Sequence, residues 1–166
     1  MTAPGPHPRR QQALAATCLL VRWLLGALFI YMGLNKTLHP VEFLKLVRQY
    51  DLTDNSLLLN LVAGGLPWFE VWCGLLLVAG VAVRGVALLL VAMLVPFSLV
   101  VLRRALHLHE TGGLPFCMIK FDCGCGTGEV LICRKLAENA MLVLLSLGLI
   151  VRRHHPLGLF KAAPPD

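Results

Sequence analysis

Four long apolar segments alternate with short polar stretches along the chain. They cover approximately residues 14–34, 57–80, 82–102 and 131–151. Because about 20 helical residues cross the hydrocarbon core of a bilayer, each segment is long enough to span it. The pattern predicts an all-α integral membrane protein whose four transmembrane helices form a bundle.

A shorter amphipathic stretch separates the first two apolar segments. In "NKTLHPVEFLKLVRQYDLTDNS", apolar residues recur at helical spacing with charged residues between them. The apolar positions are Val41, Phe43, Leu44 and Val47. This spacing predicts a short helix that lies at the membrane interface.

The connections between the segments define the expected organisation. The second and third segments are joined by a tight turn around residues 80–85, which predicts an antiparallel hairpin. We expect the four-helix domain to cover residues 13–152, with a cysteine-rich loop at 103–130. Residues 1–12 are expected to be a disordered basic segment, and residues 153–166 a flexible tail.

Composition supports lipid as the solvent of this chain. Of its 166 residues, 57% are hydrophobic and only 14% are charged, against about 25% charged in soluble domains. The net charge of +6 fits juxtamembrane contacts with anionic lipid headgroups. No basic run is interleaved with aromatic residues, so nucleic acid is not an expected partner.

Four crossings place both termini on one side of the membrane. Lysine and arginine residues are similarly frequent on the two sides, so charge alone does not set the orientation. Disulfide chemistry belongs in an oxidising compartment. We therefore expect a multi-pass protein of the inner or plasma membrane, with cytoplasmic termini and the cysteine-rich loop on the exported side.

Two charged residues lie well inside apolar segments. Arg22 and Glu70 fall at similar depths counted from the terminal side, on glycine-bearing faces that allow two helices to approach closely. Because an unpaired charge in the membrane costs several kcal/mol, an Arg22–Glu70 pair is predicted. A structural ion pair is the favoured interpretation, with ligand or proton handling as the alternative. Cys18 and Cys73 lie one turn away, as small buried residues or as a redox pair.

Four cysteines gather near the third polar stretch, and three interpretations compete for them. They are Cys117, Cys123, Cys125 and Cys133, with His107 and His109 upstream. These six side chains could bind zinc or copper, although one residue between two cysteines suits a zinc knuckle poorly. They could instead form inert disulfides, whose connectivity the sequence does not decide.

A reactive thiol–disulfide site is the third interpretation and the one we favour. Gly124 gives the backbone freedom that a tight ring between Cys123 and Cys125 would need. Thr127 is a plausible N-cap of the fourth helix, so the motif would adjoin a helix N-terminus. The positive end of a helix raises the thiolate fraction of a nearby cysteine.

Several stretches together resemble the MauE/DoxX group of small four-helix membrane proteins. They are "RWLLGALFIYMGLNKTLHPVEFLKLVRQYDL", "LPWFEVWCGLLLVAG", "CGC" and "KLAENAMLVLLSL". The residues at matching positions are Arg22, Lys36, Pro67, Glu70, Gly74, Cys123 and Cys125. The usual CGCFG continuation is here "CGCGTGE", and Cys117 and Cys133 look like additions.

The resemblance implies a four-helix bundle with a role in disulfide formation or maturation of an exported partner. Membrane thiol oxidoreductases of the DsbB and vitamin K epoxide reductase kind offer a mechanistic analogy. By that analogy Cys123 and Cys125 exchange with a protein, Cys117 or Cys133 relays, and a quinone is a possible electron acceptor.

The leading hypothesis is thus a membrane protein that handles disulfide exchange or electron transfer for an exported or membrane-bound redox protein. The first alternative is a non-enzymatic membrane scaffold subunit of an oxidoreductase complex. The second is a membrane component that binds metal through the cysteines and histidines named above.

Overall fold

The computed structural model describes residues 8–50, 55–112, 115–122 and 129–152. The described part is almost entirely helical. Its helices are α1 (Pro8–Leu38), α2 (Pro40–Gln49), α3 (Ser56–Ala79), α4 (Val83–Gly112) and α5 (Ile132–Val151). A 3-10 helix η1 (Phe116–Met118) and two short strands, β1 (Lys120–Asp122) and β2 (Glu129–Leu131), precede α5.

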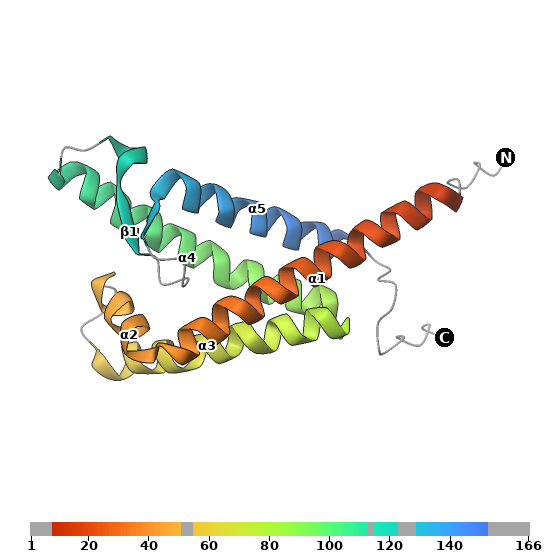
Figure 1. Ribbon diagram of the computed structural model, residues 1–166, viewed down its shortest axis with the longest axis horizontal. Coiled ribbons are helices and arrows are strands. Elements are labelled where there is room, and N and C mark those ends of the chain that lie inside the picture. The colour runs from red at the N-terminus through yellow and green to blue at the C-terminus, as the bar shows by residue number, and fades with distance from the viewer. Residues whose placement is uncertain (1–7, 51–54, 113–114, 123–128, 153–166) are drawn as a thin grey trace.

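The long helices form two antiparallel pairs, α1 with α3 and α4 with α5 (Figure 1). The pairs meet near the start of α4 and diverge toward the end that carries α2 and the strands. The start of α1 and the end of α5 share the other end of the molecule, where a side-chain nitrogen of Arg152 donates to the carbonyl oxygen of Leu14. Hence α2 and the strands lie opposite the helix ends nearest the chain termini.

Glycines bring α1 and α3 into backbone contact. A Cβ added at Gly26 would lie 2.8 Å from the carbonyl oxygen of Gly74, and one added at Gly33 would lie 2.6 Å from that of Pro67. Both distances are shorter than van der Waals contact between carbon and oxygen. The predicted close approach of the glycine-bearing faces is therefore confirmed, and only glycine fits at these positions.

The ends of α3 explain why its bounds match the predicted segment. The side-chain oxygen of Asn55 accepts hydrogen bonds from the backbone N–H groups of Leu57 and Leu58, at 3.0 and 3.3 Å. At the other end Gly80 adopts φ 75°, the left-handed conformation that favours glycine and ends helices. Only three residues separate α3 from α4, so the predicted tight turn is confirmed.

Two boundaries differ from those predicted. Helix α1 begins at Pro8, inside the segment expected to be disordered, and α4 continues to Gly112 rather than ending near residue 102. The expected loop 103–130 therefore contributes nearly three further turns of helix and, in β1 and β2, a small hairpin. Apolarity marks where a helix lies in lipid, but backbone hydrogen bonding continues beyond it.

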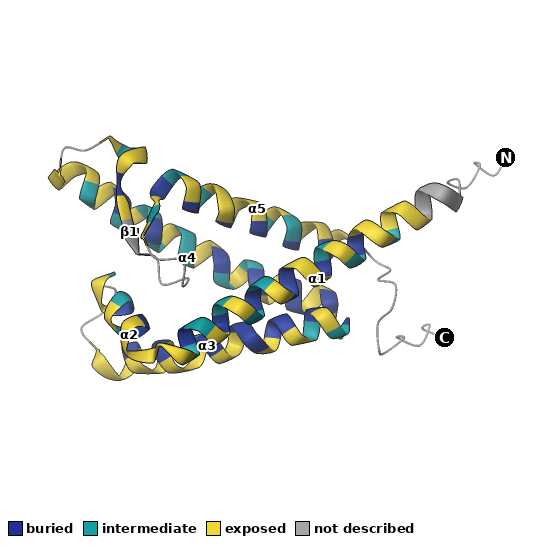
Figure 2. Ribbon diagram, viewed as in Figure 1, coloured by how far each residue is buried: buried dark blue, intermediate teal, exposed yellow. Residues whose placement is uncertain are grey.

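The outer surface of the bundle is apolar, as expected in a lipid environment. Large hydrophobic side chains such as Leu20, Trp72, Leu88 and Leu144 are exposed on the long helices (Figure 2). Three helices, at Gln12–Leu38, Ser56–Ala79 and Val83–Gly112, are long and apolar enough to span a membrane. The chain is thus an all-α membrane protein, apart from its one described hairpin.

Two finer expectations stay predictions. Helix α5 carries Arg134, Lys135 and Glu138 in its first two turns, and it is not among the three apolar spans. The amphipathic helix α2 forms as expected, and it packs Phe43 and Val47 onto α3. The fourth crossing and the interfacial position of α2 both depend on where the bilayer lies.

Candidate functional site

A disulfide joins Cys117 to Cys133 at the end of the molecule opposite the start of α1 and the end of α5. Cys117 lies in η1 and is exposed, whereas Cys133 lies in the first turn of α5 and is half-buried. Their Cα atoms are 5.1 Å apart, within the range that disulfides require. The structure therefore brings two of the predicted cysteines together, in one of the pairings left open by the sequence.

The disulfide closes the base of the β1–β2 hairpin. Cys117 precedes β1 and Cys133 follows β2, and the backbone N–H of Ile132 donates to the carbonyl oxygen of Ile119 beside it, at 3.1 Å. The strands pair in antiparallel register out to the residue just before position 123. Three strand residues extend about 10 Å, which separates the disulfide from the far end of the hairpin.

The CGC cysteines themselves, Cys123 and Cys125, lie outside the described residues, as does Thr127. The expectation that the motif adjoins a helix N-terminus is nevertheless wrong. Helix α5 starts at Ile132 and its N-cap residue is Leu131, because β2 occupies the residues before it. The motif therefore does not directly precede a helix N-terminus, and the predicted contribution of the helix dipole to thiolate formation was wrong.

An apolar cluster lies beneath the disulfide and fixes the hairpin to the helices. Its buried members are Val101, Ala105, Ile119 and Ile132, and Tyr50, Phe97 and Cys133 pack against them. The rings of Tyr50 and Phe97 meet edge to face, with centroids 6.5 Å apart. Through this cluster, the disulfide region is joined to both α2 and the middle of α4.

The predicted histidine ligands do not join this group. His107 and His109 are exposed on the last turns of α4, and the ring of His109 contacts Phe116 edge to face. In the part of the chain that the structure describes, no group of three or more potential ligand side chains could hold a metal ion. With Cys117 and Cys133 joined to each other, their thiols are not available as metal ligands in this state.

A buried ion pair joins α1 to α3. The Lys36 ammonium donates to both carboxylate oxygens of Glu70, at 2.5 and 2.7 Å, and both side chains are almost fully buried. The same ammonium lies 5.3 Å from the centroid of the Phe43 ring. Pairing with hydrogen bonds to both oxygens is what allows two charges to stay buried in an apolar bundle.

This arrangement corrects the predicted Arg22–Glu70 pair. Gly26 packs against the turn of α3 that begins at Gly74, and this register places Arg22 at the level of the end of α3. Arg22 and Glu70 are therefore separated by about 15 Å along the helix axes. The prediction assumed that residues 14 and 80 lie at the same depth, but this register places residue 14 more than two helical turns beyond the end of α3. Lys36, placed by the resemblance alone, is the ion-pair partner of Glu70.

The other two intramembrane cysteines behave as small core residues. Cys18 and Cys73 are buried in the largest apolar cluster of the bundle, together with Leu25, Phe29 and Leu77. Their burial fits the favoured interpretation of the sequence.

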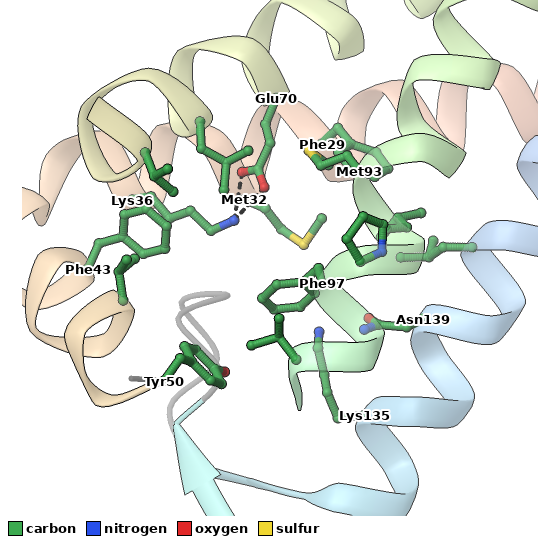
Figure 3. A pocket seen from close by; sticks show the side chains of 17 residues that line it. Phe29, Met32, Lys36, Phe43, Tyr50, Glu70, Met93, Phe97, Lys135 and Asn139 are labelled. Atoms are coloured by element: carbon green, nitrogen blue, oxygen red, sulfur yellow. Dashed lines mark hydrogen bonds and ion pairs between the residues drawn. The ribbon is translucent and has the colours of Figure 1, made fainter. Parts of the chain in front are cut away.

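A cavity of about 310 Å³ separates the two helix pairs at the end where they diverge. Its walls come from α1, α2 and α3 on one side and from α4 and α5 on the other (Figure 3). The lining is mostly apolar and includes the aromatic rings of Phe29, Phe43, Tyr50 and Phe97. Volume and lining match those of small-molecule sites in proteins.

Polar side chains enter this cavity from opposite walls. Lys36 and Glu70 lie on the α1–α3 wall, and Lys135 and Asn139 project from α5 on the other (Figure 3). The amide nitrogen of Asn139 lies 3.1 Å from the Ser98 hydroxyl, which orients the amide side chain. The arrangement can hold a ligand that has polar atoms at two edges and an apolar body.

Lys135 is buried although it lies in the polar first turns of α5. Its ammonium is 3.9 Å from a carboxylate oxygen of Glu138, whose side chain is half-exposed and also bonds Arg134 at 2.9 Å. The cationic group therefore reaches the cavity while its counter-charge stays near the surface.

Sequence reasoning missed this second wall. Lys135, Asn139, Leu142 and Ser146 recur at intervals of three or four residues and are all buried on one face of α5. Polar residues at such spacing among apolar ones are a signal of an inward-facing polar stripe.

The fold and the site together define a helical membrane protein with a disulfide-bonded hairpin and an internal cavity. Residues 14–152, most of the chain, match the family described as methylamine utilisation protein MauE, and the chain belongs to this family. No curated protein and no solved structure matches the chain. The family supports a membrane accessory role, while the wider DoxX relationship stays a prediction.

Proposed function

We propose that this protein carries out thiol–disulfide exchange for an exported or membrane-bound redox protein. The observation that carries the proposal is the Cys117–Cys133 disulfide at the base of a hairpin whose two strands flank the CGC segment. Four cysteines thus fall within residues 117–133 of the chain. A disulfide used only for stability would not need a second pair of cysteines between its two members.

In this proposal Cys123 and Cys125 exchange with the partner. A disulfide between them accepts two electrons and two protons from a partner dithiol, which becomes a disulfide while the CGC pair becomes two thiols. Cys117 is the accessible end of the second disulfide, because it is exposed and Cys133 is half-buried. A thiolate of the CGC pair would therefore attack the Cys117 sulfur and release Cys133.

The orientation follows from the same chemistry. Stable disulfides form in oxidising compartments, so the hairpin end would face the exported side and both termini the cytoplasm. Arg84 and Arg152 lie near the terminal end, where Arg84 donates to the Ile150 carbonyl oxygen at 2.9 Å. Because lysine and arginine are similarly frequent toward the two ends, the proposed orientation rests on the disulfide chemistry alone.

The experiment is capture of a mixed disulfide in membranes. In the Cys125→Ala variant, Cys123 lacks its neighbouring thiol and should stay attached to the partner as a reductant-sensitive adduct. The matched control is Cys73→Ala, because Cys73 is buried in the core and should not affect capture. Mass spectrometry of the adduct would identify the partner.

A non-enzymatic scaffold is the alternative, and the family's membrane accessory role supports it equally. If Cys123→Ser and Cys125→Ser left the partner's disulfides fully formed and no adduct appeared, the exchange proposal would be wrong. Co-purification of the partner with those variants would then favour the scaffold.

A further inference from the structure

We propose that the cavity between the two helix pairs binds a single-chain lipid with a carboxylate head, such as a fatty acid. Lys135 and Asn139 of α5 hold the carboxylate, and the acyl chain lies against the apolar lining. This inference goes beyond the thiol chemistry and does not depend on it, since neither Cys117 nor Cys133 lines the cavity. Three features carry it: the charges of the two walls, the direction in which polarity falls, and the size of the cavity.

The charged groups of the α1–α3 wall are already matched to each other. The Lys36 ammonium donates to both carboxylate oxygens of Glu70 and lies 5.3 Å from the centroid of the Phe43 ring. One positive and one negative charge therefore cancel within this wall. A polar head that bound here would have to compete with a buried ion pair, so its recognition falls to the opposite wall.

The first two turns of α5 carry an excess of positive charge. Arg134 and Lys135 supply two positive charges, and both lie near the single negative charge of Glu138, at 2.9 and 3.9 Å. These three side chains together carry one net positive charge. Arg134 is exposed, whereas the Lys135 side chain is buried and lines the cavity. One carboxylate in the cavity would balance the excess, and a buried cation is stabilised by such a partner.

Asn139 supplies a second donor on the same face of α5. It follows Lys135 by four residues, so the two side chains are neighbours on the helix surface (Figure 3). Its amide nitrogen lies 3.1 Å from the Ser98 hydroxyl, which in turn donates to the carbonyl oxygen of Leu94 at 2.7 Å. Because an amide nitrogen has two hydrogens, the second can donate to a carboxylate that is bound by the ammonium.

Polarity falls from one end of the cavity to the other. Lys135 lies in the first turn of α5, at the end of the molecule that carries the strands. Phe29, Leu94 and Leu142 line the cavity and also belong to the largest apolar cluster of the bundle. Leu142 lies two helical turns beyond Lys135, about 10 Å along the axis of α5. A head group at Lys135 therefore directs its acyl chain toward the core.

Other classes of ligand fit the cavity less well. A small hydrophilic anion would lose its hydration against a mostly apolar lining, with few donors to replace the water. A phospholipid has two acyl chains, but a volume of about 310 Å³ lies at the lower end of the range of ligand sites. One apolar chain with one negative charge meets both conditions. Three of the helices that form the walls are apolar enough to span a membrane, so a surrounding bilayer would supply such a lipid.

The test uses the full-length protein in nanodiscs of phosphatidylcholine, a lipid without net charge. Palmitate with a photoreactive diazirine in its chain is added and irradiated, and the labelled residues are mapped by mass spectrometry. We expect labelling of cavity residues such as Met93 and Leu142, which saturates and which unlabelled palmitate removes. Leu144 is the internal control, because it is exposed on the outer surface of the same helix as Leu142 and should show only non-saturable labelling.

Substitutions then test the proposed contacts. Lys135→Met should weaken palmitate binding roughly tenfold, while Lys135→Arg, which keeps the charge and its donors, should retain most of it. Val100→Phe keeps every charge and should also weaken binding, because its ring occupies the space of the acyl chain. Lys45→Met is the matched control, since it removes an exposed positive charge from α2 and leaves the cavity lining unchanged.

Competition by other lipids tests the class of ligand on the unmodified protein. Hexadecanol, which has the same chain length and no charge, should compete roughly tenfold more weakly than palmitate. Equal competition by hexadecanol would overturn the inference, because the carboxylate would then not be recognised. Stronger competition by phosphatidylglycerol would overturn it in favour of an anionic phospholipid, and equal labelling of Leu142 and Leu144 would show that the cavity is not a binding site.

The same labelling separates this inference from the proposed thiol–disulfide exchange. Cys123→Ser removes a proposed exchanging thiol and should leave palmitate labelling unchanged. Failure of palmitate to bind would overturn this inference and leave the exchange proposal standing. A loss of labelling in Cys123→Ser would contradict the independence of the two sites.

Discussion

Two interfaces of this bundle, the one between α1 and α3 and the one between the two helix pairs, are built in opposite ways. Between α1 and α3, glycines at positions 26, 33 and 74 let the backbones touch, and no side chain larger than hydrogen fits there. Between the α1–α3 pair and the α4–α5 pair, large side chains surround a cavity into which two lysines project. The first interface holds a fixed helix register, and the second leaves room for a ligand.

The Lys36–Glu70 pair lies where these two interfaces meet. It crosses from α1 to α3, and both of its members also line the cavity. Its geometry depends on the close helix approach, because the register set by the glycines brings the two side chains to one level. The close contact between α1 and α3 thus positions two charged side chains that line the cavity between the helix pairs.

The largest effect is expected from breaking this pair. Glu70→Leu leaves the Lys36 ammonium buried without its carboxylate, which should lower the free energy of unfolding by about 3–5 kcal/mol. Denaturation in detergent micelles would measure it. The double variant Lys36→Met/Glu70→Leu should recover much of the loss, because no uncompensated charge then stays buried.

A matched surface pair supplies the control for that prediction. Arg134 and Glu138 form an exposed bond at 2.9 Å, and Arg134→Gln should change stability by less than about 0.5 kcal/mol. Equal losses at the two pairs would show that burial does not matter here, contrary to our argument.

A smaller effect is expected from widening the tight interface. In Gly74→Ala the new Cβ would lie 2.6 Å from the Gly26 carbonyl oxygen, so the helices must move apart at a cost of about 1–3 kcal/mol. Gly64→Ala in the same helix meets nothing within 4 Å and should be neutral or slightly stabilising. Thermal unfolding of the two variants tests the difference, and similar behaviour would contradict the packing described.

The smallest stability effect is expected from filling the cavity. Val100 lines it from α4, and Val100→Phe adds apolar volume where space exists, so stability should change by less than about 1 kcal/mol. A destabilisation as large as that of Gly74→Ala would indicate that the cavity is already closed by packing.

Much of the fold follows from local features of the sequence. The four apolar segments, the amphipathic helix with Phe43 and Val47 inward, and the turn at Gly80 all depend on residues close together in the chain. Helix ends in polar sequence were less well predicted, since the last turns of α4 are stabilised by backbone hydrogen bonds and contacts with the hairpin. Such contacts leave no periodic signal.

The site was predicted only in part. The cysteine cluster was visible from the sequence, and the structure joins Cys117 to Cys133. The partner of Glu70 could not be found by counting residues from the apolar boundary of each helix. The relative register of α1 and α3 depends on which glycines are in contact. The spacing of Lys135 and Asn139 indicates an inward-facing polar stripe, but only the structure shows that this stripe faces a cavity.

The sequence by itself determined that this chain is helical, membrane-embedded, and unusually rich in thiols before its last helix. Apolar length and residue type suffice for these conclusions, because a bilayer requires every backbone polar group to be bonded within a helix. Only the tertiary structure decided that Glu70 pairs with Lys36, and that a cavity opens between the two helix pairs. These features depend on the register and divergence of helices distant in sequence, which side-chain packing across the whole bundle sets.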